Sequence, residues 1–278
     1  MTSKSLLSAV FIGAAVLLPG GFRAAAQEAA PGATPVQGRH DTPLIPGTRW
    51  HVHDPERPQP AVITPGSAST PDTPGQPPSD AVVLFNGHDL SPWSDDDGHT
   101  PAWKVTDGVM SPAGGGTIHT LQEFGDVQVH VEFATPVPAR GEGQERGNSG
   151  VFLQGLYEVQ VLDSYRNKTY PDGQAGAIYG QNPPQVNAAR PPGEWQTYDI
   201  VFTAARFTPE ETLKTPAYLT VFHNGVLVQD HVALLGPTMN GALAKYELTP
   251  PTGPLSLQDH GNGVRFRNVW VRPLPASK

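Results

Sequence analysis

The sequence predicts an all-β fold, a concanavalin- or laminarinase-like jelly-roll sandwich of two antiparallel sheets. From about Asp80 onward, short strand-like segments alternate with turn residues, and helical periodicity is scarce. Apolar and polar residues alternate through 127–133, which places three Val and one Phe on a single face. Asn224-Gly225 separates two apolar segments at the spacing of a two-residue hairpin. These three observations favour a sandwich over any fold that needs helices.

Ten strands follow from these patterns, with irregular stretches between them. The three longest irregular stretches, 136–147, 165–175 and 180–193, exceed simple connections and are candidate walls of a binding cleft. The expected strands are 81–85, 103–106, 117–121, 127–133, 150–154, 157–162, 195–203, 217–223, 226–230 and 264–272.

The first 79 residues differ in composition from the rest. Lys4 precedes an apolar run over 6–18 and small residues at 24–26, which predicts a signal peptide over 1–26 and a periplasmic or extracellular location. Residues 27–79 hold 12 of the 31 prolines and are expected to form an extended Pro-rich arm. The sandwich then covers 80–273, and 274–278 form a tail.

Composition narrows the classes of partner. A formal net charge of -8 argues against nucleic acid and anionic membranes, since both need a basic surface. The absence of cysteine excludes disulfides and thiolate chemistry. No segment after the leader is apolar enough to span a membrane. A neutral ligand such as a carbohydrate is therefore expected.

One strand carries polar groups in a pattern that suggests chemistry. In 157–161, Glu158 and Gln160 share one face, and a one-residue bulge at Val161-Leu162 would return Asp163 to that face. This spacing resembles the bulged Glu-x-Asp-x-x-Glu strand of laminarinase-like glycosidases. Gln160 replaces the middle acid and Asp163 is shorter than the expected Glu, so hydrolysis by two carboxylates is disfavoured. An alternative is a sheet with a solvated outer face.

Several motifs occur together in a specific order. They are Leu84-Phe85-Asn86-Gly87, Leu90-Ser91-Pro92-Trp93, Asn148-Ser149-Gly150-Val151, the 157–164 segment, Gly176-Ala177-Ile178-Tyr179-Gly180, Pro192-Gly193-Glu194-Trp195, Leu257-Gln258-Asp259-His260-Gly261 and 264–269. This order resembles the 3-keto-disaccharide hydrolase family over about 80–273. The resemblance implies a secreted, glycoside-active jelly roll.

The candidate site gathers residues from these motifs. Gln258 and His260 are two apart and would share a face, and the 261–263 turn leads into a strand that bears Arg265 and Arg267. A bound divalent cation remains an open possibility, because acids and His are suitable ligands although no spacing is diagnostic. The expected catalytic residues are Glu158, Asp163 and His260, and the expected substrate-binding residues are Asn148, Gln160, Tyr179, Gln258 and Arg267. Of these, Glu158, Gln160, Asp163, His260 and Arg267 are expected to point into one concave cleft.

The functional hypothesis is cleavage of the O-glycosidic bonds of 3-keto-disaccharides or related glycosides. Oxidation at C3 acidifies the C2 hydrogen, so a base can remove it and expel the C1 oxygen, after which water adds. The alternatives are a non-catalytic carbohydrate-binding module and an extracellular interaction protein, because sandwich folds host all three.

Overall fold

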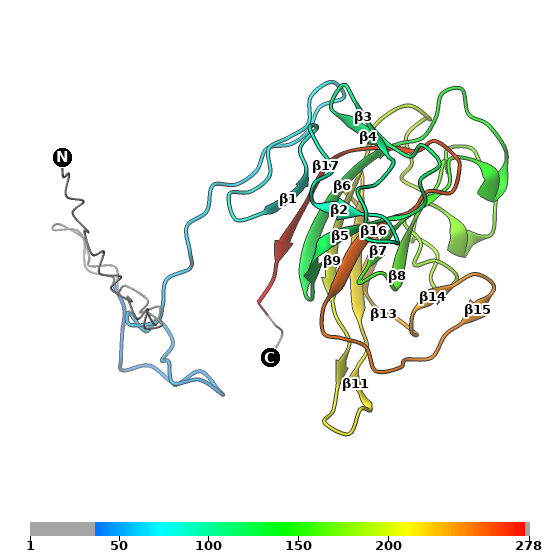
Figure 1. The fold of residues 1–278 in the computed structure, drawn as a ribbon. Helices are drawn as coiled ribbons and strands as arrows, with labels where there is room; N and C mark the ends of the chain where they lie inside the picture. The colour runs from blue at the N-terminus through cyan, green and yellow to red at the C-terminus, as the bar shows by residue number, and fades with distance from the viewer. Residues whose placement is uncertain (1–36, 276–278) are drawn as a thin grey trace, which may run out of the picture. The chain divides into compact units, whose positions relative to one another are not determined.

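The computed structural model describes residues 37–275 and confirms the predicted sandwich of two antiparallel sheets (Figure 1). No α-helix occurs in these residues, and the two short 3-10 turns are η1 (Gly143–Glu145) and η2 (Pro171–Gly173). The eight-stranded sheet contains β1 (Val82–Phe85), β3 (Lys104–Thr106), β4 (Val109–Ser111), β6 (Val127–Ala134), β9 (Gln196–Thr203), β12 (Tyr218–His223), β13 (Val226–Ala233) and β17 (Arg265–Pro273). The five-stranded sheet contains β2 (Trp93–Ser94), β5 (Ile118–Phe124), β7 (Ser149–Leu153), β8 (Tyr157–Val161) and β16 (Gly253–Leu257).

Strand order shows that neighbours in space are often distant in sequence. The eight-stranded sheet runs β13-β12-β9-β6-β17-β4-β3, with β1 also paired to β17. The five-stranded sheet runs β2-β5-β16-β7-β8. Two small ribbons lie outside these sheets, β10 (Arg206–Phe207) with β11 (Leu213–Thr215) and β14 (Thr238–Met239) with β15 (Ala242–Leu243). The C-terminal strand β17 thus pairs centrally with β6, which fixes its register.

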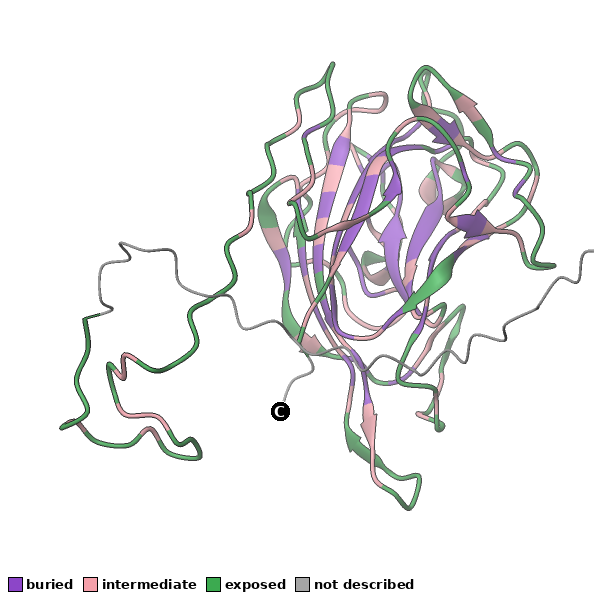
Figure 2. Ribbon diagram, turned by 60° about the vertical axis from the view of Figure 1, so that its left-hand side comes forward, coloured by how far each residue is buried: buried purple, intermediate pink, exposed green. Residues whose placement is uncertain are grey.

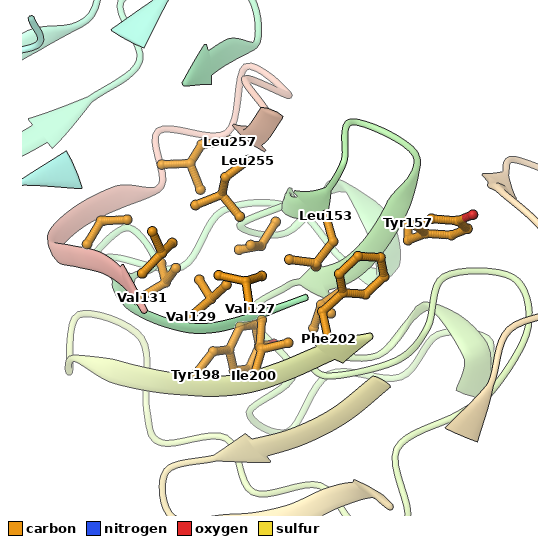
Figure 3. Close-up of a cluster of buried hydrophobic side chains, with 14 of the residues drawn as sticks. Val127, Val129, Val131, Leu153, Tyr157, Tyr198, Ile200, Phe202, Leu255 and Leu257 are labelled. Atoms are coloured by element: carbon orange, nitrogen blue, oxygen red, sulfur yellow. The ribbon is translucent and has the colours of Figure 1, made fainter. Parts of the chain in front are cut away.

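The hydrophobic core fills the space between the two sheets. Alternate residues of β6 and β9 point inward from one sheet, and residues of β7 and β16 meet them from the other (Figure 3). Figure 2 shows buried residues concentrated on the strands and exposed ones on the connections. Each fully buried large apolar side chain contributes roughly 1.5–3 kcal/mol, so this layer is the main stabilising element.

The Asn224-Gly225 hairpin forms as predicted. Both residues have positive φ, 53° and 78°, as a type I′ turn requires, and His223 pairs with Val226 across it. By contrast, β16 has no counterpart among the expected strands. Pro254 cannot donate to a ladder, so its segment reads as a loop. Pro254 nevertheless lies beside Glu123 where the register shifts, and β16 becomes a central strand between β5 and β7.

The N-terminal part divides between two compact units, 1–61 and 62–278. Within the described part of the first, Leu44 and His51 form an isolated bridge. Residues 62–79 belong to the same unit as the sandwich. The predicted signal peptide, 1–26, and residues 27–36 lie outside the described residues. Among the described residues, no helix has the length and apolarity needed to cross a bilayer.

Candidate active site

Glu158 and Gln160 lie along one face of β8, as the alternation predicts. Tyr157, Val159 and Val161 are fully buried in the core, so the side chains of Glu158 and Gln160 point to the other face of the five-stranded sheet, its outer face. On β7, Phe152 is the partner of Glu158 and Gly150 is the partner of Gln160. Neither polar residue is solvated, since Glu158 is 6% exposed and Gln160 1% exposed. A solvated outer face is therefore the wrong description of this strand.

The Glu158 carboxyl is buried without a partner. No side chain or backbone group among the described residues hydrogen-bonds to the carboxyl or pairs with it. The backbone N–H of Glu158 donates to Thr238 Oγ1 at 3.0 Å. Burial raises the pKa of Glu158 to about 8. The carboxyl is accordingly protonated at neutral pH and has a proton to donate. Raised carboxyl pKa values of this kind are a feature of general acids.

A glycine makes room for this carboxyl. A Cβ added at Gly150 would collide with Oε1 of Glu158 and would lie 2.8 Å from a ring carbon of Phe152. Gly150 does not have positive φ, so its role is close approach and not backbone conformation. The absent side chain lets the Glu158 carboxyl lie across β7.

Gly150→Ala is therefore expected to displace the Glu158 carboxyl and to lower activity about 10²-fold, the cost of a misplacement of about 1 Å. The free energy of unfolding should fall by only about 1–3 kcal/mol, as in other overpacked sites. Steady-state kinetics and urea unfolding of the same preparation measure the two effects. Full activity in a folded Gly150→Ala variant would contradict a role for this geometry.

Gln160 is oriented by two amide neighbours. Its Nε2 donates to Asn148 Oδ1 at 2.9 Å and to Gln144 Oε1 at 3.3 Å, while Asn148 Nδ2 donates to the Gln144 carbonyl at 2.8 Å. Gln160 Oε1 is buried and has no hydrogen-bond partner among the described residues. Gln160 is 1% exposed, so this oxygen lies beneath the surface, and the role of Gln160 is to orient the amides of Asn148 and Gln144.

Tyr179 lies next to Glu158. An isolated bridge between Val159 and Ile178 brings its segment beside β8, and its N–H donates to the Glu158 carbonyl at 3.2 Å. The Tyr179 hydroxyl hydrogen-bonds Tyr170 Oη at 2.8 Å and Asn240 Oδ1 at 3.3 Å. These three residues line a cavity of about 560 Å³. Aromatic walls with hydroxyl and amide groups suit a sugar ring.

Asp163 does not take the position expected from the bulge. Val161 and Leu162 are both buried, which breaks the alternation there, but β8 ends at Val161 and the Asp163 N–H donates to the Arg146 carbonyl. Asp163 Oδ2 accepts from Arg146 Nε at 2.8 Å, and Oδ1 accepts from the Tyr165 N–H at 3.2 Å. It lines a different cavity, of about 360 Å³, whose lining residues do not include Glu158. Its carboxylate has a structural partner and is not a free nucleophile.

The Gln258–His260 segment continues from β16 along β7. The Gln258 N–H donates to the Gly150 carbonyl at 3.0 Å, and Ser149 Oγ donates to the Gln258 carbonyl at 2.6 Å. The Asn148 N–H donates to Asn262 Oδ1 at 3.1 Å. These bonds hold the loop from Gln258 to Asn262 beside Asn148. The His260 side chain is exposed. The segment lies next to β7, the strand paired with the Glu158 strand β8, but no hydrogen bond or ion pair joins His260 to Glu158.

Arg267 is not in this site, and its assignment to the Glu158 cleft is wrong. It belongs to β17 of the eight-stranded sheet, where the adjacent Phe266 is fully buried in the core and Arg267 points away from it. Its Nε donates to Glu132 Oε2 at 2.7 Å. Sequence proximity to His260 suggested a shared cleft, but the 261–263 turn carries the chain from one sheet to the other.

Two polar residues on the outer face were absent from the predicted set. His119 on β5 and Ser256 on β16 are register partners, and Ser256 is also the partner of Phe152, so they share the row of Glu158. His119 Nδ1 lies 2.8 Å from Ser256 Oγ, and Nε2 lies 2.7 Å from Asp96 Oδ1. Recognition of β16 as a strand would have revealed this row.

The described part of the chain contains no group of three or more His, Cys, Asp or Glu side chains arranged to hold a metal ion. The predicted candidates Glu158, Asp163 and His260 are not such a group.

Comparisons with known proteins agree with this fold. Residues 80–272 match the family described as the 3-keto-alpha-glucoside-1,2-lyase-like domain. A crystal structure from Parabacteroides distasonis ATCC 8503, whose name assigns it provisionally to the glycosyl hydrolases, is 42% identical with a TM-score of 0.75, covering 83% of this chain and 100% of that one. Another from the same organism is 23% identical, with a TM-score of 0.52 over 70% of this chain and 94% of that one, and shows the fold alone.

No curated protein matches the chain. The family match and the fold together support a carbohydrate-active, glycosyl hydrolase-like role.

Proposed function

Because the chain belongs to the 3-keto-alpha-glucoside-1,2-lyase-like family, we propose that it is a secreted enzyme that cleaves the glycosidic bond of 3-keto-disaccharides or related glycosides by elimination and hydration. The observation that carries the proposal is the neutral, unpartnered Glu158 carboxyl on the outer face of the five-stranded sheet. Retention by two carboxylates would need a second free acid. Asp163, the candidate for that role, is paired with Arg146.

Elimination needs a base for the C2 proton and an acid for the leaving oxygen. The base removes the C2 proton made acidic by the 3-keto group, the C1–O bond breaks, and the acid protonates the departing oxygen. The product is an unsaturated 3-keto sugar, to which water adds to give the free 3-keto sugar. No covalent bond to the enzyme forms.

Glu158 is assigned as the acid, because its raised pKa keeps it protonated at neutral pH. His260 is assigned as the base, since the loop that bears it is fixed to β7 beside Gly150. Asn148 is assigned to bind sugar hydroxyls, with its amide oriented by Gln160 and Gln144, and Tyr179 forms one wall of the adjacent cavity. Gln258, directly after β16, completes the assigned binding set.

The proposal predicts exchange at C2. A 3-keto disaccharide turned over in heavy water is expected to yield a 3-keto sugar with solvent deuterium at C2, since that proton leaves during cleavage and water adds afterwards. The unmodified disaccharide should not be cleaved, because its C2 hydrogen is not acidic. Proton NMR of the products measures both results. Cleavage with complete retention of the original C2 hydrogen would replace elimination with direct displacement at C1.

A carbohydrate-binding module is the second candidate, favoured by the hydroxyls of Tyr170 and Tyr179 on one cavity. Calorimetric binding of both disaccharides without turnover of either would select it.

A further inference from the structure

A second groove lies on the outer face of the eight-stranded sheet, on the side of the sandwich away from Glu158. Its volume is about 980 Å³, at the upper end of the usual range for small-molecule sites. Residues of β6, β9 and β17 form its floor, the 190–195 loop forms one wall, and residues 66–78, here called the strap, form the other. Nothing in the proposed reaction uses this groove.

The strap is fixed to the sheet and is a built part of the groove. Arg267 Nη2 donates to the Thr70 carbonyl at 2.7 Å, and Nη1 donates to the Pro71 carbonyl at 3.1 Å. Ser69 Oγ donates to Glu132. A buried ion pair therefore anchors the strap at the middle of the groove, and the remaining space stays open beside it.

Trp195 and Trp270 line this groove, and their indole N–H groups are free, unlike those of two other tryptophans. Trp93 and Trp103 give their indole N–H groups to the carbonyls of Leu84 and Gly116, at 2.8 and 2.9 Å. Among the described residues, the indole N–H groups of Trp195 and Trp270 have no such acceptor, although both residues line the groove. Arg267 lies over the Trp195 ring at 4.2 Å and His130 stacks on Trp270 at 5.0 Å, so one face of each ring is covered and the free N–H groups are what these residues offer a polar ligand.

Further hydrogen-bonding groups lie on the same floor. Thr197 lines the groove and its hydroxyl makes no hydrogen bond within the described residues. Asp199 accepts from His130 through Oδ1 at 2.7 Å, which leaves Oδ2 free to accept. On β9, the Thr197 hydroxyl can therefore donate and accept, and Asp199 Oδ2 can accept. This mixture matches the hydroxyl groups of a carbohydrate, each of which both donates and accepts.

The charges of the groove nearly cancel. Its lining carries four carboxylates, two guanidinium groups and His130. Burial lowers the pKa of His130, but hydrogen bonds to Asp199 and Glu132 outweigh this effect and raise it to about 9, so the imidazole is charged at neutral pH. Glu132 is paired with Arg267. The lining therefore carries a net charge of only about -1, which disfavours an anionic ligand and suits a neutral one.

We propose that this groove is a second carbohydrate-binding site, which binds a neutral oligosaccharide between the strap and the 190–195 loop. Binding there would hold a longer glycan against the protein without contacting the Glu158 face. The inference does not depend on the reaction proposed above, because no groove residue belongs to the Glu158 site.

Isothermal titration of the full chain with maltotriose, cellotriose and laminaritriose tests the site. At least one of these unmodified trisaccharides is expected to bind. Thr197→Val removes one donor and keeps the shape of the side chain, and Trp195→Phe removes one donor together with part of the ring; each should weaken binding at least about fivefold, the effect of one hydrogen bond. The double variant should weaken it at least about 25-fold. Thr106→Val, an exposed threonine on β3 outside the groove, is the matched control and should change nothing.

Two results would overturn the proposal. One is that none of the three trisaccharides binds at millimolar concentration. The other is that binding is unchanged in the Thr197→Val/Trp195→Phe double variant. Binding lost in Glu158→Gln but retained in the double variant would assign the sugar to the Glu158 face instead. The groove variants should keep full turnover of a 3-keto disaccharide, so failure of this proposal is distinguishable from failure of the proposed reaction.

Discussion

Glu158→Gln is expected to lower turnover of a 3-keto glycoside by roughly 10²- to 10⁴-fold, the contribution typical of a general acid. The amide has nearly the shape of the protonated carboxyl, but it cannot release a proton to the departing oxygen. His260→Ala should reduce turnover by a similar factor if His260 is the base. Steady-state kinetics on one 3-keto disaccharide measures both variants.

Glu158→Gln also tests whether the Glu158 carboxyl is neutral in the folded protein, through the pH dependence of unfolding. The pKa of Glu158 is about 8 in the folded chain, against an ordinary value of 4.5. Between these pH values the folded state keeps a proton that the unfolded state releases, so the free energy of unfolding of the wild type falls as pH rises, by about 1.4 kcal/mol per pH unit at most. Glu158→Gln lacks this loss and should be the more stable protein at pH 8, with the difference absent near pH 4.

Two outcomes would count against the assignment of Glu158. Unchanged turnover in a folded Glu158→Gln variant would exclude it as the acid. Equal pH dependence of unfolding in the two proteins would show that its carboxyl is not held neutral, and would remove the reason for choosing it. Urea unfolding at pH 4, 6 and 8 decides the second point.

Arg267→Met is expected to reduce the free energy of unfolding by about 3–5 kcal/mol, the cost of leaving a buried charge without its partner. Glu132 is fully buried, and Arg267 is 5% exposed. Burial raises the pKa of Glu132, but hydrogen bonds from His130, Ser69, Asn268 and Arg267 lower it to about 2. Methionine fills similar volume but provides no donor. Urea unfolding at pH 7 measures the loss.

The Glu132→Gln/Arg267→Met double variant is the control. Removal of both charges should recover much of the stability lost in the single variant, since well-packed neutral residues often replace a buried ion pair at little cost. A double variant as unstable as Arg267→Met would point to the strap carbonyls of Thr70 and Pro71 as the more important partners. Wild-type stability of Arg267→Met would contradict the structural role assigned to this residue.

Two predicted strands carry the clearest local signal. In 127–133 and 157–161 the residues alternate strictly between apolar and polar, and only one register places every apolar side chain in the core. β16 lacked this signal because its segment contains Gly253 and Pro254, and only its neighbours β5 and β7 make it a strand. Local pattern therefore specified strands that bury a clean face, and failed where pairing partners supplied the stability.

The candidate site divides in the same way. Side chains alternate between the two faces of a strand, so the sequence alone put Glu158 and Gln160 on one face. Burial of these side chains required Gly150 from β7 and the 176–179 segment, which lie near them only in the folded chain. The positions of Asp163 and Arg267 also depend on partners from other segments, Arg146 and Glu132, and the predicted single cleft that joins both residues to Glu158 was wrong.

The sequence by itself determined the fold class and the face on which Glu158 lies, because both depend on side-chain period along single strands. Only the tertiary structure decided which acid is free and neutral and which is paired. Solvation and charge pairing depend on the neighbours within a few ångströms of a carboxyl, and for these carboxyls those neighbours include other strands and loops.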